Sequence, residues 1–229
     1  MNIIFSEERI DGMNTQFTYE LLKPANIQPG KKYPVIFLMH GMGSNEQNML
    51  PFVAGMGKDL FVVSIRGPLH QPPGYAFFTI QEYGKPHKQA FDDVVNKLED
   101  FIEYALGNYP IDESKVFLMG FSQGAILSMT LGLKLGNRIK GIIALSGYIP
   151  AIVKDDYEIS PLNGVNAFIS HGQHDQVLPY EWGLDAERFL EQNGAITTFM
   201  SYPEGHTVSQ ENYNDYTTWF TKLEKEKEN

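Results

Sequence analysis

Short runs of consecutive apolar residues, each followed by turn-forming residues, constrain the fold of this chain most strongly. The run at residues 35–39 (VIFLM) precedes the glycine-rich segment 40–44, and the run at residues 60–65 (LFVVSI) precedes Arg66-Gly67-Pro68. A strand that is apolar at nearly every position is buried on both faces, whereas a strand with one face in water alternates. We therefore expect a sheet that is covered on both sides.

Helical patterns separate the expected strands. Residues 89–106 carry apolar side chains at three- and four-residue steps, which is typical of an amphipathic helix, and residues 123–135 are apolar almost all round, which predicts a buried helix. The other expected elements are strands at residues 17–22, 116–119, 139–145, 165–170 and 196–202, and helices at residues 180–192 and 208–223. This alternation predicts an α/β fold with a mostly parallel central sheet and helices on both faces. Such sheets place their active sites at the carboxyl ends of the strands.

The chain has the length of a single α/β domain. Its 229 residues contain neither a linker nor an internal repeat, so residues 1–229 are expected to form one domain. The charged tail, residues 222–229, is expected to fray.

Charge and composition limit the partners. The net charge of −10 disfavours nucleic acid and anionic lipid as ligands, and no apolar run approaches the roughly 20 residues that span a bilayer, so we expect no membrane insertion. The chain has no cysteine, which excludes disulfides, thiolate metal sites and a cysteine nucleophile, and fits a reducing compartment. Residues 1–10 lack the pattern of a secretory signal, so a cytoplasmic protein is expected. A homodimer is an open option.

The segment Gly120-Phe-Ser122-Gln-Gly124 is a candidate nucleophile turn, because it has the pattern G-x-S-x-G between an expected strand and an expected helix. The serine of such a turn is strained and exposed, and side chains two positions away on either side would collide. The pattern alone is common, but its position between strand and helix favours Ser122 as a nucleophile.

An oxyanion hole needs backbone N–H donors near the nucleophile. One donor is expected from the residue after the serine, Gln123, and the second from the loop that follows an earlier strand. That loop is residues 40–44 (HGMGS), and we assign the second donor to Met42. Taken alone, this segment fits an ordinary glycine-rich connection equally well.

A serine nucleophile also needs a base and a carboxylate that orients the base. The chain order of an α/β-hydrolase is serine, acid, histidine. His206 follows the strand expected at residues 196–202, and Asp175 follows the strand expected at residues 165–170, so these two residues are the predicted base and acid. A metal site at His171, His174 and Asp175 is the alternative, although histidines at this spacing without thiolates are a weak signal. We interpret His171 as a structural residue, His174 as an exposed one, and expect no metal and no cofactor.

Six segments, taken together in this order, resemble the phospholipase/carboxylesterase family, which includes small bacterial carboxylesterases and acyl-protein thioesterases. They are HGMGS (40–44), RGPLHQPPGYAFF (66–78), GFSQG (120–124), ALSGYIP (144–150), HGQHDQVLP (171–179) and YPEGH (202–206). The resemblance implies an α/β-hydrolase with little or no lid, in which Ser122, Asp175 and His206 form the triad. It also implies that Met42 and Gln123 form the oxyanion hole and that residues 74–78 and Tyr148 lie beside the acyl pocket.

Two positions depart from the family pattern. Ala125 stands where the family often has glycine, and Phe77-Phe78-Thr79 replaces the more usual Trp-Phe-Asp. The expected substrate is a small-molecule ester with a short or medium acyl chain. The candidate substrate-binding residues are Tyr75, Phe77, Phe78, Tyr148 and Val177.

The predicted function is that of a serine carboxylesterase acting through an acyl-enzyme intermediate. Acyl-protein thioesterase or lysophospholipase activity is the alternative of the same class. Metal-dependent hydrolysis, a catalytically silent ligand-binding protein on a hydrolase scaffold and, less favoured, a peptidase are the other hypotheses.

Overall fold

One seven-stranded sheet forms the centre of the computed structural model, which describes residues 17–225. Its strands are ordered β1-β3-β2-β8-β9-β10-β11. Their bounds, in chain order, are β1 (Tyr19–Leu22), β2 (Tyr33–Met39), β3 (Phe61–Ile65), β8 (Ile111–Phe121), β9 (Gly141–Leu145), β10 (Asn166–Gly172) and β11 (Ile196–Tyr202). Within this sheet β1 pairs antiparallel with β3, and the other neighbours pair in parallel.

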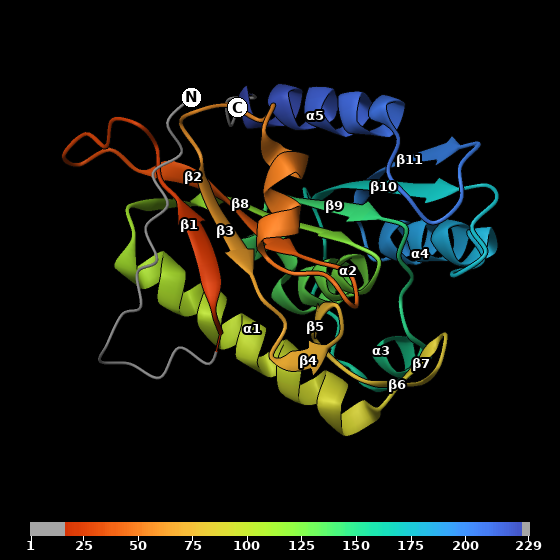
Figure 1. The fold of residues 1–229 in the computed structure, drawn as a ribbon. Coiled ribbons are helices and arrows are strands. Elements are labelled where there is room, and N and C mark those ends of the chain that lie inside the picture. Colours follow the sequence, from red (N-terminus) through yellow and green to blue (C-terminus); the bar gives the residue numbers. More distant parts are fainter. Residues whose placement is uncertain (1–16, 226–229) are drawn as a thin grey trace.

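Helices cover both faces of the sheet (Figure 1). The first apolar cluster includes side chains of α1 (Lys88–Asn108), α2 (Gln123–Leu135) and α4 (Tyr180–Gln192), which pack on one face. The second includes side chains of η1 (Gln47–Val53) and α5 (Gln210–Lys225), which lie on the opposite face. Two short elements, η2 (Gly136–Arg138) and α3 (Ala151–Asp156), complete the helical set of the described residues. The expected three-layer α/β architecture is confirmed.

Burial explains why the apolar runs were informative. Every residue of β2, β3 and β9 is buried, because these strands have a neighbour on each side and a helical layer on each face. The edge strand β11 is mostly exposed or half-buried, which agrees with its mixed sequence ITTFMSY.

Several elements were not expected from the sequence. Between β3 and α1 the chain forms two small antiparallel hairpins, one from β4 (Leu69–Gln71) and β5 (Gly74–Ala76), the other from β6 (Ile80–Glu82) and β7 (Lys85–Pro86). The short helices η1 and α3 were also missed. Strands of two or three residues carry no periodicity, so no pattern could announce these hairpins.

Part of the charged tail is ordered in a helix, which differs from the sequence-based expectation. Helix α5 runs to Lys225, so residues 222–225, which we expected to fray, are helical, and the buried side chain of Leu223 packs them on the sheet. Residues 226–229 and residues 1–10, whose sequence lacks the pattern of a secretory signal, lie outside the described residues. Within residues 17–225, none of the helices combines the length and the apolar character that crossing a bilayer requires.

The parallel strands bring the candidate residues together. The loops after the carboxyl ends of β2, β8, β9, β10 and β11 carry, in that order, Met42, Ser122, Tyr148, Asp175 and His206. These loops meet at one edge of the sheet because the strands that lead into them point the same way.

Candidate active site

Ser122 occupies a strained turn between β8 and α2. Its φ of 53° and ψ of −116° are unusual for a residue with a side chain. The turn is tight enough that a Cβ at Gly120 would overlap the backbone of Gly124, and a Cβ at Gly124 would overlap the carbonyl oxygen of Met39. The two glycines of G-x-S-x-G therefore have a steric reason, and α2 begins directly behind the serine with its positive end toward the site.

Ser122, His206 and Asp175 form one continuous chain of hydrogen bonds. Nε2 of His206 lies 2.8 Å from Oγ of Ser122, and Nδ1 of His206 lies 2.7 Å from Oδ2 of Asp175. The ring of Phe121 packs against the imidazole, with 5.0 Å between the ring centroids. This geometry allows the histidine to take the serine proton while the carboxylate holds the ring.

The side chain of Asp175 is buried, and its partners keep it ionised. Burial opposes its charge, yet hydrogen bonds from His206 and from the amides of Leu178 and Val177 hold the pKa of its carboxyl below the usual value. Oδ1 accepts both amides, at 2.8 Å from Val177 and 2.9 Å from Leu178, which leaves Oδ2 for the histidine. The carboxylate is therefore fixed in direction as well as in charge.

The other two histidines of this region have separate roles. His171 is buried and its Nε2 donates to the carbonyl oxygen of Leu178 at 3.0 Å, so it supports the loop that carries Asp175, as expected. His174 is exposed, also as expected. No group of three or more potential ligands suited to a metal ion occurs among residues 17–225. The ring nitrogens of His206 face a serine and an aspartate, so the arrangement does not fit the alternative of a metal site.

The amides of Met42 and Gln123, the candidate oxyanion donors, have no hydrogen-bond acceptor among residues 17–225. Gln123 is the first residue of α2, where backbone N–H groups lack an intrahelical partner. Met42 and Gln123 also line the same pocket as Ser122. Both amides are thus available to a ligand atom.

A buried histidine holds the loop that carries Met42. Nδ1 of His40 lies 2.7 Å from the carbonyl oxygen of Gly41, and its Nε2 accepts the N–H of Gly67 at 2.9 Å. Since Nε2 is an acceptor, Nδ1 carries the proton and donates to Gly41. Burial is the main cause that lowers the pKa of His40, so the neutral ring is favoured.

An ion pair fixes the far end of the same loop. The carboxylate of Glu46 accepts two hydrogen bonds from Arg66, at 2.7 Å to Nε and 2.5 Å to Nη2, and the guanidinium lies 4.7 Å from the ring centre of Tyr75. Backbone hydrogen bonds join Tyr75 to Gly43 and to Ser44. The loop is therefore bound to the β4–β5 hairpin and to the end of β3.

The side chain of Gln123 has a role that the sequence did not reveal. It is buried, with Oε1 accepting the amide of Phe77 at 2.6 Å and Nε2 donating to the carbonyl oxygen of Phe78 at 2.8 Å. The residue after the nucleophile thus also holds the chain segment beside it.

A pocket of about 200 Å³ opens beside Ser122. Its lining is mainly apolar and comprises Met42, Phe78, Ile80, Tyr83, Ser122, Gln123, Ile126, Tyr148, Val177, Leu178 and His206. Phe78, Tyr148 and Val177, which the sequence predicts to bind the substrate, all lie in this lining. No sequence pattern predicts the other apolar lining residues Ile80, Tyr83, Ile126 and Leu178, of which Ile80 and Tyr83 come from the β6–β7 hairpin.

The model of the family described as phospholipase/carboxylesterase matches residues 25–223, which is most of the chain. The chain belongs to the phospholipase/carboxylesterase family.

Individual relatives agree with this membership. Acyl-protein thioesterase 1 of Candida albicans is 31% identical over 216 residues, covering 84% of this chain and 92% of that protein. The putative hydrolase MhqD of Bacillus subtilis is 23% identical over 193 residues, covering 84% of this chain and 95% of that protein. The crystal structure of a Bacillus cereus carboxylesterase superposes with a TM-score of 0.82 at 22% identity, covering 92% of this chain and 96% of that one, and so shares the fold.

Two of the residues predicted to contact the substrate of this phospholipase/carboxylesterase family member lie outside the lining of this pocket. Tyr75 and Phe77 do not line the pocket. Phe77 is buried against the ring of His40, with 4.8 Å between centroids, because consecutive side chains of an extended segment point to opposite sides and Phe78 faces the pocket. The ring of Tyr75 instead packs with Arg66, and its backbone is hydrogen-bonded to the loop of residues 40–44.

The two departures from the family pattern have local explanations. The methyl group of Ala125 is accommodated because residue 147 is glycine, where a Cβ would lie 2.6 Å from that of Ala125. Thr79 pairs with His87, with 2.9 Å between Oγ1 and Nδ1. The latter contact closes the base of the β6–β7 hairpin.

Proposed function

We propose that this protein is a serine hydrolase that cleaves small-molecule carboxylic esters with short to medium acyl chains. The hydrogen-bonded chain from Ser122 through His206 to Asp175, opening into an apolar pocket, is the observation that carries the proposal. Membership of the phospholipase/carboxylesterase family supports it.

The proposed reaction has two acyl-transfer steps. Ser122 Oγ attacks the ester carbonyl carbon while Nε2 of His206 takes its proton, and the resulting oxyanion accepts hydrogen bonds from the amides of Met42 and Gln123. His206 then gives the proton to the leaving alcohol, which departs and leaves an acyl-enzyme. A water molecule, deprotonated by the same histidine, attacks the carbonyl carbon of that ester. The bond to Ser122 Oγ then breaks, His206 returns the proton to Oγ, and the acid is released. Asp175 stays ionised throughout, which agrees with its lowered pKa.

Thioester hydrolysis is the second candidate. The relative that is 31% identical is named an acyl-protein thioesterase, and the same serine chemistry cleaves both kinds of ester. Comparing oxygen esters and thioesters with the same acyl group would rank the two activities.

Covalent labelling tests the proposal directly. A fluorophosphonate probe is expected to label the wild type and not Ser122→Ala, and hydrolysis of p-nitrophenyl esters is expected to disappear in the same variant. His174→Ala is the matched control, because His174 is an exposed neighbour of the proposed acid and should label normally. A wild type that neither labels nor hydrolyses any ester would favour the ligand-binding alternative.

A further inference from the structure

The outer wall of the pocket comes from the hairpin formed by β6 and β7. Ile80 and Tyr83 of this hairpin line the pocket, and Tyr83 is 61% exposed. Met42, on the loop after β2, lines the same pocket and is 41% exposed. Two large side chains are therefore partly exposed at one opening of the pocket.

The base of the hairpin is fixed to the neighbourhood of the nucleophile. The amide of His87 donates to the carbonyl oxygen of Thr79 at 3.0 Å, and their side chains also pair. The preceding residue, Phe78, is held by the side chain of Gln123. The position of the hairpin therefore depends on the residue that follows Ser122.

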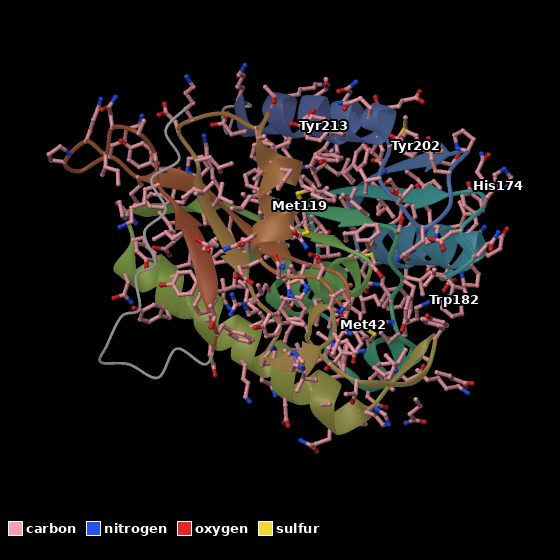
Figure 2. The ribbon with its side chains drawn as sticks, viewed as in Figure 1. Met42, Met119, His174, Trp182, Tyr202 and Tyr213 are labelled. Carbon is pink, nitrogen blue, oxygen red and sulfur yellow. The ribbon has the colours of Figure 1, made fainter. Side chains whose placement is uncertain are left out.

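The tip of the hairpin is fixed to the opposite side of the pocket. Gly84 has a φ of +87°, and a Cβ there would lie 2.8 Å from the ring of Trp182. Its backbone also hydrogen-bonds the phenol of Tyr148, whose pKa is raised to about 12 by burial despite this bond. The rings of Tyr148 and Trp182 pack edge to face at 4.9 Å, and Figure 2 labels Trp182. Held at both ends, the hairpin is a fixed wall.

The size and chemistry of the pocket limit what it can hold. A volume of about 200 Å³ is below the roughly 300–1,000 Å³ typical of small-molecule sites. Apart from Ser122, Gln123 and His206, its lining is apolar or aromatic. Such a pocket fits one short, uncharged hydrocarbon chain.

The acyl chain suits this pocket better than the leaving group does. The acyl chain stays bound to Ser122 between the two steps, whereas the leaving alcohol must depart and be replaced by water next to His206. We propose that Ile80 and Tyr83 of the β6–β7 hairpin are specificity-determining residues that limit the length of the acyl chain. This inference rests on the proposed esterase function.

Truncating Ile80 or Tyr83 tests whether the β6–β7 hairpin limits the length of the acyl chain. The quantity to measure is the ratio of kcat/KM for p-nitrophenyl decanoate to that for p-nitrophenyl acetate, in the wild type, Tyr83→Ala and Ile80→Ala. One extra methylene in an apolar pocket changes kcat/KM by about 10–200-fold, so each truncation is expected to raise the ratio at least about tenfold. Gly84→Ala, which displaces the tip from Trp182, is expected to raise it too. Ile196→Ala is the control, since Ile196 is 59% exposed on the edge strand β11 and should leave the ratio unchanged.

The possible results distinguish a failure of the proposed role of the hairpin from a failure of the proposed esterase function. Labelled, active variants with the wild-type ratio would overturn the role of the hairpin and leave the esterase intact. A shift found only with acetate esters of lengthening alcohols would overturn the assignment to the acyl chain. A wild type that is neither labelled nor active would overturn the esterase function and the inference with it.

Discussion

The imidazole of His40 and the amide of Met42 are joined through a single peptide unit. His40 donates to the carbonyl oxygen of Gly41 at 2.7 Å, and that carbonyl shares a planar peptide bond with the Met42 N–H. In a trans peptide the C=O and N–H bonds point in opposite directions. His40 therefore fixes the direction in which the proposed oxyanion donor points, without touching the substrate itself.

Replacing His40 should thus impair the transition state more than substrate binding. We expect His40→Ala to lower kcat by about 10- to 100-fold with a smaller change in KM, because an oxyanion donor acts on charge that develops during the reaction. Steady-state kinetics with p-nitrophenyl butanoate measures both constants. His40→Asn, whose carboxamide retains a donor, should recover part of kcat. A loss confined to KM, in a variant with wild-type circular dichroism, would contradict this positioning role.

Much of the fold was predictable because burial leaves a strong pattern. The runs at 35–39 and 60–65 are strands with a neighbour on each side, and the helices at 123–135 and 180–192 have the predicted bounds. The candidate residues Ser122, Asp175 and His206 were found from chain order and from their positions after strands. The homodimer and the cytoplasmic location remain predictions.

The pocket was predicted less well because side-chain direction in irregular segments has no periodic signal. Phe77 and Phe78 are adjacent and both buried, yet only Phe78 lines the pocket. Tyr83 lies in a polar stretch, QEYGK, and lines the pocket beside Gly84, which packs on Trp182, a residue distant in sequence. The hydrogen bond between Thr79 and His87 closes the β6–β7 hairpin, but the sequence does not show that these two residues pair.

Removing the charge of Asp175 should nearly abolish turnover. We expect Asp175→Asn to lower kcat by about 10⁴-fold, because the amide presents an N–H where Nδ1 of His206 needs an acceptor and so favours the wrong tautomer. The measurement is kcat with p-nitrophenyl acetate at neutral pH. His174→Ala should retain wild-type kcat. Equal losses in both variants, reversed by added metal, would support the metal-dependent alternative instead.

Buried neutral histidines predict acid sensitivity of the fold. Burial is the main cause that lowers the pKa of both His40 and His171, so below pH 6.5 the unfolded chain binds protons that the folded chain does not. The free energy of unfolding should therefore fall as the pH falls below about 6.5, by up to about 1.4 kcal/mol per pH unit for each histidine. Urea unfolding at pH 7.5, 6.5 and 5.5 measures this slope.

Single replacements show which histidine causes the pH dependence of the free energy of unfolding. His171→Gln is expected to make it shallower, because the glutamine has no proton to gain in this range. Ile196→Gln is the control, because it places the same side chain at an exposed position that has no titratable group, and it should keep the wild-type slope. An unchanged slope in His171→Gln would show that this ring is protonated equally in both states.

Two glycine-to-alanine changes in helices should have opposite effects on stability. A Cβ at Gly124, in the first turn of α2, would overlap the carbonyl oxygen of Met39 on β2, so Gly124→Ala is expected to reduce the free energy of unfolding by about 3 kcal/mol or more. A Cβ at Gly107, near the end of α1, meets nothing within 4 Å. Gly107→Ala should therefore raise the free energy of unfolding by about 0.5–1 kcal/mol, as alanine does in an unhindered helix.

Urea unfolding of both variants beside the wild type separates close packing from helix propensity. Propensity alone predicts that both alanines stabilise, whereas close packing of α2 on β2 predicts that only Gly107→Ala does. If Gly124→Ala were as stable as the wild type, α2 could move away from β2 without cost. The strained backbone of Ser122, in the turn that joins β8 to α2, would then not depend on this contact.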